Sequence, residues 1–354
     1  MKMKRFSIAI AVAGSVWLGG AASSAEAAPC LIVTLTGTGG PPAVNGLAGA
    51  GTLVRYGDDS NNCGAIKLQF DTGRGTNLRL SQVGVSPGQL NAAFFTHMHF
   101  DHTEDFASVV QARWHFNSTG PKIDVVCSAD AVSTFGFTVS CNKFVTHIGD
   151  AFLQAGEIAQ RHSENKERLL GGPADLINVI TFEPKNEPQV VWSSGDVKVS
   201  AVRSTHILGH ASYRVDSPAG SVVIGGDAGN DALAPPRATS TSNQVETLAR
   251  GVDIIVHTTM HPVMGPDKDS GMPPAIFYRQ STATDLGAMA KRVGANHLML
   301  THLGAPLGVE RSGPFRIPGG PLTEADYRKA VEASGFTGNV VVGTDLASVR
   351  LPAK

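Results

Sequence analysis

Three histidines and one aspartate crowd into the stretch His97-Met98-His99-Phe100-Asp101-His102. The stretch follows an apolar, strand-like run at residues 91–96 and precedes a helical pattern at 104–113. A loop after a strand can point alternate side chains the same way, so its first two histidines can reach one ion. The aspartate and the last histidine can then turn toward a second ion. Imidazole nitrogens with a carboxylate suit zinc or another first-row metal, so the stretch predicts a metal site.

Three further candidate ligands stand where other apolar runs end: His206, Asp227 and His302. A run of this kind is typical of a buried strand, and the ends of neighbouring strands meet at one edge of a sheet. Ligand types at several strand ends, far apart in the sequence, predict one shared centre more strongly than any single residue does.

The first 28 residues have the pattern of a secretory signal. Lys2, Lys4 and Arg5 precede the apolar run 6–18, and Ala25-Glu26-Ala27 offers small residues for cleavage. We therefore expect residues 1–28 to be a signal peptide and 29–354 to form one hydrolase domain. The expected location is periplasmic or secreted, with no membrane association after cleavage. An uncleaved anchor helix is the alternative.

The chain contains four cysteines, which in an exported protein predict two disulfides. The pairing of neighbours in sequence, Cys30 with Cys63 and Cys127 with Cys141, closes the shortest loops. The two other connectivities stay open.

The charge balance is slightly acidic. The formal net charge is −1, and loss of residues 1–28 removes three positive charges and one negative charge, which leaves −3. No run of basic residues resembles a nucleic-acid-binding surface. The sequence therefore predicts no nucleic-acid partner.

Short apolar runs separated by glycine-rich breaks alternate with helical patterns in both halves of the chain. The expected strands are 31–36, 52–56, 65–70, 92–96, 123–127, 190–193, 197–204, 212–215, 221–224, 253–256, 297–301 and 339–342, and the expected helices are 104–113, 150–169, 242–250, 281–293 and 323–334. This order predicts an α/β layered sandwich. Residues 150–175 form a surface helix or an inserted arm, and the long loops 258–280 and 303–322 are of a length that is usually functional.

The motifs in this order resemble the metallo-β-lactamase fold superfamily, in particular its ribonuclease Z and zinc-arylsulfatase branch. The matching pieces are Gly37-Thr38-Gly39, 70–76, 96–102, His206 with Tyr213, Gly226-Asp227 and Thr301-His302-Leu303. The resemblance spans about 31–350 and implies a four-layer αββα sandwich with a one- or two-metal site along its edge.

The resemblance also implies how the ligands divide between two Zn²⁺ ions, or two other first-row metals. The first ion takes His97, His99 and His206, the second takes Asp101, His102 and His302, and Asp227 bridges them. Two neighbouring ions that share a bridging carboxylate hold a hydroxide between them as the nucleophile. Asp101 can also hydrogen-bond that hydroxide, whereas Asp71 is expected to organise a turn beside the site.

One motif departs from the family. Its tRNA-processing members carry His-Ser-Thr where this chain has Gln280-Ser281-Thr282. Glutamine cannot donate a proton as a general acid. The change favours esters with good leaving groups, or it moves the acid to His257 or His261.

We therefore expect an exported dinuclear-zinc hydrolase of a small-molecule ester, foremost an aryl sulfate or a phosphodiester, with a homodimer among the assemblies it allows. The alternatives are a lactonase or β-lactamase-type carbonyl hydrolase, a ribonuclease Z-like phosphodiesterase, and a di-iron redox protein. A di-iron redox protein usually has a carboxylate in the histidine cluster, and this chain lacks that carboxylate.

Overall fold

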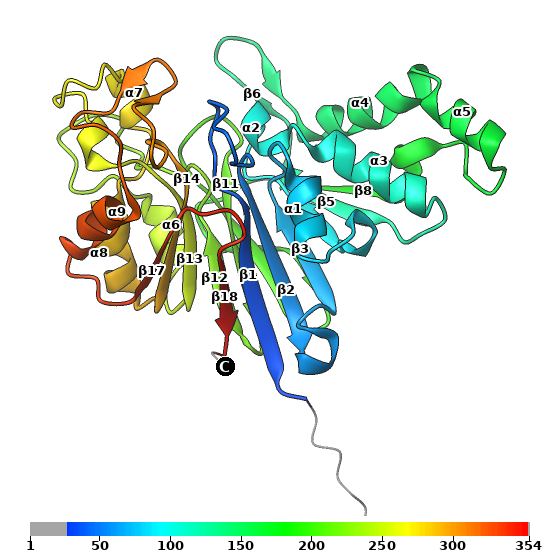
Figure 1. Cartoon of the computed structure of the whole chain (residues 1–354), viewed down its shortest axis with the longest axis horizontal. Helices are drawn as coiled ribbons and strands as arrows, with labels where there is room; N and C mark the ends of the chain where they lie inside the picture. Colours follow the sequence, from blue (N-terminus) through cyan, green and yellow to red (C-terminus); the bar gives the residue numbers. More distant parts are fainter. Residues whose placement is uncertain (1–26, 353–354) are drawn as a thin grey trace, which may run out of the picture.

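Two β-sheets packed face to face form the centre of the molecule, and helices cover both outer faces (Figure 1). The computed structural model describes residues 27–352. The expected signal peptide lies, apart from its last two residues, outside this range and stays a prediction. The layers confirm the αββα sandwich.

The first sheet has seven strands. Its order is β18 (Ser348–Leu351), β1 (Pro29–Gly37), β2 (Gly51–Asp58), β3 (Ile66–Phe70), β4 (Ala92–Phe94), β5 (Ile123–Ser128) and β8 (Ile177–Phe182). Pairing is antiparallel from β18 to β3 and parallel from β3 to β8.

The second sheet repeats this mixed pattern. Its seven strands follow the order β17 (Asn339–Val342), β14 (His297–Leu303), β13 (Ile254–Thr259), β12 (Gly220–Ile224), β11 (Ala211–Ser217), β10 (Val197–Arg203) and β9 (Gln189–Ser194). Pairing is parallel from β17 to β12 and antiparallel from β12 to β9. In both sheets, parallel strands send their carboxyl ends to one rim.

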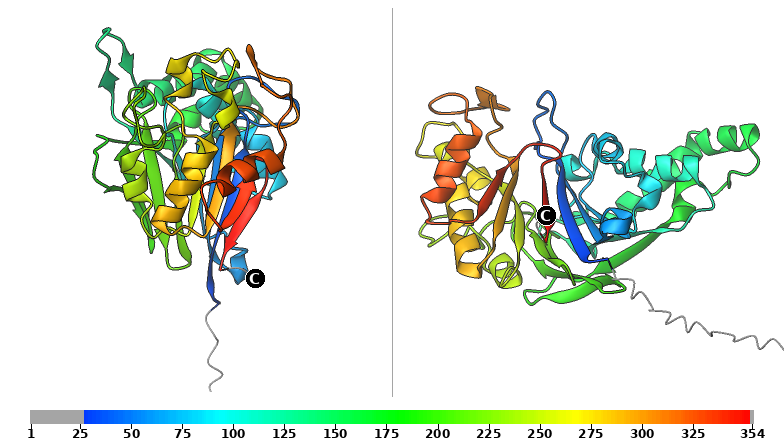
Figure 2. Two further views of the ribbon diagram at one scale, coloured as in Figure 1. Left: turned by 90° about the vertical axis from the view of Figure 1, so that its left-hand side faces the viewer. Right: turned by 60° about the horizontal axis from the view of Figure 1, so that its bottom comes forward.

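The helices divide between the two outer faces (Figures 1 and 2). On the side of the first sheet lie α1 (Thr76–Gln82), α2 (Phe100–Thr103), α3 (Phe106–Phe116) and α4 (Cys141–Gln154), and α5 (Glu157–Glu164) follows α4 away from the sheet. The second sheet carries α6 (Asn243–Leu248), α8 (Ala283–Val293) and α9 (Glu324–Glu332). Smaller elements at the rim are α7 (Pro274–Phe277) and the hairpins β6 (Ala131–Val132) with β7 (Thr138–Val139) and β15 (Arg311–Ser312) with β16 (Phe315–Arg316).

Each interface between layers has its own apolar core. Between the sheets, the rings of Phe70 and Phe94 stack at 4.6 Å, and Tyr213 from the opposite sheet meets Phe94 edge-on at 5.4 Å. Full burial of one such side chain contributes about 1.5–3 kcal/mol. These cores hold the strands firmly and leave their ends free to carry polar groups.

The expected strands agree with the structure to within three residues at either end. No element was expected where the structure has α1, α2, α7, β6, β7, β8, β15, β16 and β18. The single helix expected at 150–169 is wrong. Two helices, α4 and α5, stand there, because Gly156 adopts a left-handed backbone (φ 80°) that ends one helix and starts the next.

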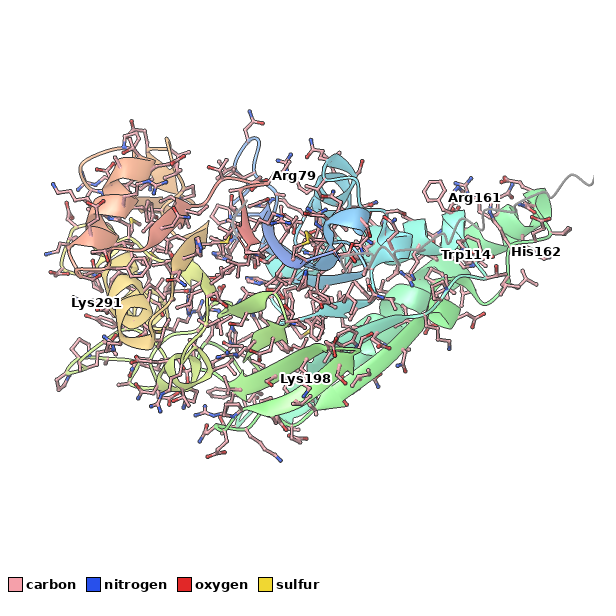
Figure 3. The ribbon with its side chains drawn as sticks, turned by 90° about the horizontal axis from the view of Figure 1, so that it is seen from below. Arg79, Trp114, Arg161, His162, Lys198 and Lys291 are labelled. Carbon is pink, nitrogen blue, oxygen red and sulfur yellow. A yellow bond between two sulfur atoms is a disulfide. The ribbon has the colours of Figure 1, made fainter. Side chains whose placement is uncertain are left out.

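Helices α4 and α5 project from the body as an arm, with Arg161 and His162 on its outer part (Figure 3). The base of the arm is anchored, because the buried Trp114 donates a hydrogen bond from Nε1 to the Leu169 carbonyl at 3.1 Å. Ile158 and Leu176 cover the same ring. Of the two sequence interpretations, the structure has the arm.

Two disulfides join Cys30 to Cys63 and Cys127 to Cys141, which is the pairing with the shortest loops. None of the helices in residues 27–352 has both the length and the apolar character that a membrane span requires.

Candidate metal centre

The seven predicted ligands converge at the rim where the parallel strands end. His97 follows β4, His206 follows β10 and Asp227 follows β12. His302 is the penultimate residue of β14, and the remaining three ligands lie at the start of α2 or within it. The side chains therefore come from both sheets, and their packing against each other brings the two groups together.

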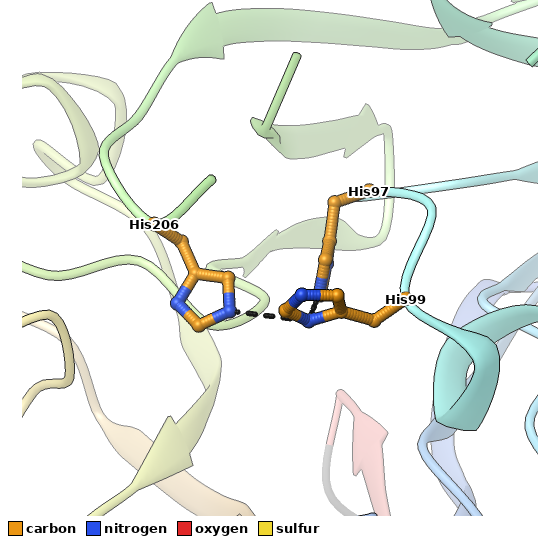
Figure 4. A group of neighbouring side chains, drawn as sticks. All are labelled: His97, His99 and His206. Carbon is orange, nitrogen blue, oxygen red and sulfur yellow. Dashed lines mark hydrogen bonds between the residues drawn. The ribbon is translucent and has the colours of Figure 1, made fainter. Parts of the chain in front are cut away.

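One cluster consists of His97, His99 and His206 (Figure 4). Nε2 of His97 lies 2.8 Å from Nδ1 of His99, and Nε2 of His206 lies 3.4 Å from the same Nδ1. One nitrogen from each of the three rings lies within 4.8 Å of the other two. Three imidazoles arranged in this way can hold one cation and leave a coordination position open.

The second cluster consists of Asp101, His102 and His302, again within 4.8 Å. Nε2 of His302 lies 3.0 Å from Oδ2 of Asp101. Nε2 of His102 and Oδ1 of Asp101 are both buried without a hydrogen-bond partner among the described residues. Two buried, unbonded ligand atoms at the centre of such a group fit the binding of a cation.

Asp227 lies between the clusters and reaches both. Its Oδ2 lies 3.5 Å from Nε2 of His206 in the first cluster and 3.6 Å from Nε2 of His302 in the second. Its Oδ1 lies 3.4 Å from Nε2 of His102. This is the position that a bridging carboxylate requires.

The protonation states of the centre fit positive charge. Burial lowers the pKa of His206 to about 4 and holds that of His97 well below its usual range, so both rings are neutral and offer lone pairs. Burial opposes ionisation of Asp227, but the charges of His302 and His102 outweigh it and hold its pKa well below the usual range. The residues present therefore fit two divalent cations.

A layer of supporting groups orients the ligands. Asp71 accepts a hydrogen bond from Nδ1 of His102 at 2.8 Å, and also from the Thr96 amide and hydroxyl, each at 2.8 Å. Such a carboxylate fixes the tautomer and the direction of a ligating histidine. The sequence interpretation placed Asp71 beside the site, but it missed this partner.

Two other groups hold Asp227. Its backbone amide donates to Nε2 of His210 at 3.1 Å, and the Thr258 hydroxyl donates to Oδ1 at 2.7 Å. His210 thus helps to hold the backbone of Asp227 in place. No sequence signal pointed to Thr258.

The catalytic role expected for His257 and His261 is not supported by where they lie. His257 is fully buried inside β13, and its Nδ1 donates to the Thr258 carbonyl at 2.7 Å. His261 packs its ring against Tyr327 at 5.0 Å and accepts a hydrogen bond from the Val263 amide at 3.2 Å. Neither ring lines the cavity at the ligands, and the catalytic role of the two residues stays a prediction.

A cavity of about 270 Å³ opens onto the centre. Four ligands form one wall: His99, His206, Asp227 and His302. The other walls are mostly apolar and include Pro42, Met260, Met272, Ile276, Leu303, Pro314 and Phe315. The long loops 258–280 and 303–322 supply most of them, so these loops shape the substrate site.

The chain is similar in sequence to ribonuclease Z of Mycobacterium bovis, with 24% identity over 323 residues that cover 91% of this chain and 98% of the relative. Ribonuclease Z of Mycobacterium avium is 27% identical over 329 residues, with the same coverage of both chains. No family profile matches the chain. Among solved structures, human tRNase Z (short form) aligns with a TM-score of 0.58 at 16% identity, covering 91% of this chain and 100% of that one.

The chain has the metallo-β-lactamase fold, and together with the site and the sequence relatives this fold defines a metal-dependent hydrolase that acts on ester bonds. Within that superfamily, the sequence relatives lie in the ribonuclease Z branch.

These relatives contradict the expectation of a small-molecule ester substrate and no nucleic acid. They are ribonucleases, and their similarity covers nearly the whole chain. The expectation relied on the net charge of the entire molecule. The binding of one phosphate depends instead on the charge inside the cavity, where cations and single side chains act at short range.

Proposed function

We propose that this protein is an exported phosphodiesterase that uses two first-row metal ions, foremost zinc, to cleave phosphodiester bonds of RNA. The observation that carries the proposal is Asp227, whose two carboxylate oxygens face both ligand clusters across 3.4–3.6 Å. The relatives named ribonuclease Z supply the class of substrate.

The chain's own residues provide the arrangement for attack by water. When bound, two such ions supply Lewis acidity and ionise a water near neutral pH. Oδ1 of Asp101 has no other partner and can hold the proton of that water. His99 and His206 face the cavity, so a phosphodiester in the cavity lies against them. The apolar walls exclude water and offer a stacking surface at Phe315 for a base or aryl ring.

The leaving group must depart without a proton from residue 280. Gln280 lines the cavity, and its Oε1 is buried without a partner, but an amide cannot act as a general acid. An aryl sulfate, with a good leaving group, was the sequence-based prediction drawn from this residue. No finding tests that prediction.

Export is the other part of the proposal. The two disulfides are typical of an oxidising compartment, and the pattern at 1–28 is typical of a secretory signal. Cell fractionation, with amino-terminal sequencing of the recovered protein, should find it in the periplasm or the medium, starting near residue 29. Recovery of the full-length chain from the cytoplasm would contradict export.

The activity test uses purified, zinc-loaded protein with bis-p-nitrophenyl phosphate and a tRNA precursor, and p-nitrophenyl sulfate as a third substrate. The variants His97→Ala and Asp227→Ala should lose at least about 100-fold in phosphodiester cleavage. His115→Ala, a histidine outside the centre, is the matched control and should keep full activity. Metal analysis should find two ions per chain. Equal turnover by the ligand variants would refute the mechanism.

A further inference from the structure

Arg279 stands at the wall of the cavity without a partner. It lines the cavity together with His99, His206 and Asp227. Its Nε is buried and unbonded, and within residues 27–352 its guanidinium group forms no hydrogen bond or ion pair.

The fold holds Arg279 in place through the loop that carries Asp227. The Ser281 hydroxyl donates to the Ala228 carbonyl at 2.7 Å. Gly229 packs so closely that a Cβ there would lie 2.5 Å from the Arg279 carbonyl oxygen. The backbone of Arg279 is therefore fixed against the segment of the bridging carboxylate, on both sides of Gln280.

Two other partly or fully buried arginines have partners. Arg237 donates to the Tyr278 carbonyl at 2.6 Å and stacks on the Tyr278 ring at 5.0 Å. Arg113 donates to the carbonyls of Pro87 and Leu90 at 2.8 and 3.0 Å. A partly buried cation without such partners is costly, because its lost hydration is not replaced. The Nε atoms of Arg55 and Arg279 are both buried without a partner among the described residues, but only Arg279 lines the cavity.

We infer that Arg279 binds a non-bridging anionic oxygen of the phosphoryl group under attack, and thereby selects esters with a charged tetrahedral centre over neutral carboxyl esters. This inference rests on the proposed function. A guanidinium group keeps its charge at every working pH, and its planar fork matches two oxygens of one phosphate. Gln280 cannot give a proton to the leaving group, so negative charge builds up there. The guanidinium group of Arg279 can offset this charge.

The test compares Arg279→Ala and Arg279→Lys with the wild-type protein, all zinc-loaded. For bis-p-nitrophenyl phosphate, kcat/KM should fall by about 100-fold in Arg279→Ala and by less in Arg279→Lys. For neutral p-nitrophenyl acetate, any turnover by the two Arg279 variants should stay within about threefold of the wild-type value. Guanidinium chloride should restore part of the phosphodiesterase activity to Arg279→Ala and none to Asp227→Ala. Arg316→Ala removes an exposed arginine paired with Asp269 beside the cavity and is the matched control.

Binding of inorganic phosphate, measured by calorimetry on the zinc-loaded proteins, gives a readout that does not depend on turnover. Arg279→Ala should bind phosphate at least about tenfold more weakly than the wild type. An inactive wild type whose phosphate affinity still depends on Arg279 would overturn the proposed function and support this inference. Unchanged phosphate affinity in Arg279→Ala, or an equal loss on the charged and the neutral substrate, would overturn the inference.

Discussion

Asp71 accepts a hydrogen bond from Nδ1 of His102 at 2.8 Å, although 31 positions separate the two residues along the chain. The bond leaves Nε2 of His102 directed at Asp227, 3.4 Å away. Asp71 thus orients a predicted metal ligand without being a ligand itself. A substitution of Asp71 can therefore test the metal centre.

Replacing Asp71 with asparagine should weaken zinc binding by about 10–100-fold, because a ligating histidine loses the carboxylate that fixes its tautomer. Competition with a chromophoric chelator measures this affinity. Asp130→Asn changes an exposed carboxylate bonded to Ser140 and serves as the control. Equal zinc affinity in Asp71→Asn and the wild type would show that His102 is not a ligand or needs no support.

Tyr213 ties the two sheets together beneath the centre. Its buried hydroxyl donates to the Phe95 carbonyl at 2.8 Å, two residues before His97. Tyr213→Phe leaves that buried carbonyl unsatisfied and should lower the free energy of unfolding by about 1–3 kcal/mol. Urea denaturation measures the change. Tyr278→Phe, at a less buried ring, should change stability by a smaller amount, and the reverse order would contradict this account.

The metal-free protein should lose stability as the pH falls from about 6.5 to 4. Burial depresses the pKa of His206 to about 4 in the folded state, against 6.5 for an exposed ring. The unfolded chain therefore binds a proton in this window that the folded chain does not, so folding is favoured above the window and loses about 3 kcal/mol through it.

The matched variant for this effect is His206→Asn. It should unfold with a weaker pH dependence between pH 6.5 and 4, when stability is measured by denaturant titration in the presence of a chelator. His102 and His302, whose pKa values are raised, act in the opposite direction in both proteins. Only the difference between wild type and variant reports His206, and identical slopes would disprove its depressed pKa.

The Cys127–Cys141 disulfide closes the segment that carries the β6–β7 hairpin, with the two cysteines 14 positions apart. Replacing both cysteines with serine should lower the free energy of unfolding by about 3 kcal/mol, because the unfolded chain gains freedom. Thermal unfolding of the oxidised protein and the double variant measures it. A wild-type protein that is insensitive to reducing agent would argue against this bond.

The candidate ligands could be predicted because four of them crowd into residues 97–102 after one apolar run and the other three stand at the ends of further apolar runs. Strand ends that carry His or Asp have few structural reasons to do so. The same reasoning gave both sheets, since alternation and burial of strands are local signals. It failed at α4 and α5, where a single glycine with a left-handed backbone divides a continuous polar pattern.

The walls of the cavity could not be predicted, because the loops 258–280 and 303–322 have no periodicity. Arg279 gave no signal either. A lone arginine beside Gln280 acquires meaning only when Gly229 packs against its backbone, a contact across 50 positions that no local pattern contains. The roles of His257 and His261 stay predictions, since proximity in sequence to a functional loop does not fix where a ring points.

The metal ligands and the cavity wall come largely from different parts of the chain, and this separation affects how the specificity of the protein can evolve. Four of the seven ligands lie within residues 97–102, whereas most of the apolar wall follows residue 258. Changes in the later loops can therefore alter which molecules fit while the ionic core stays intact, so new specificities can evolve here by loop replacement alone.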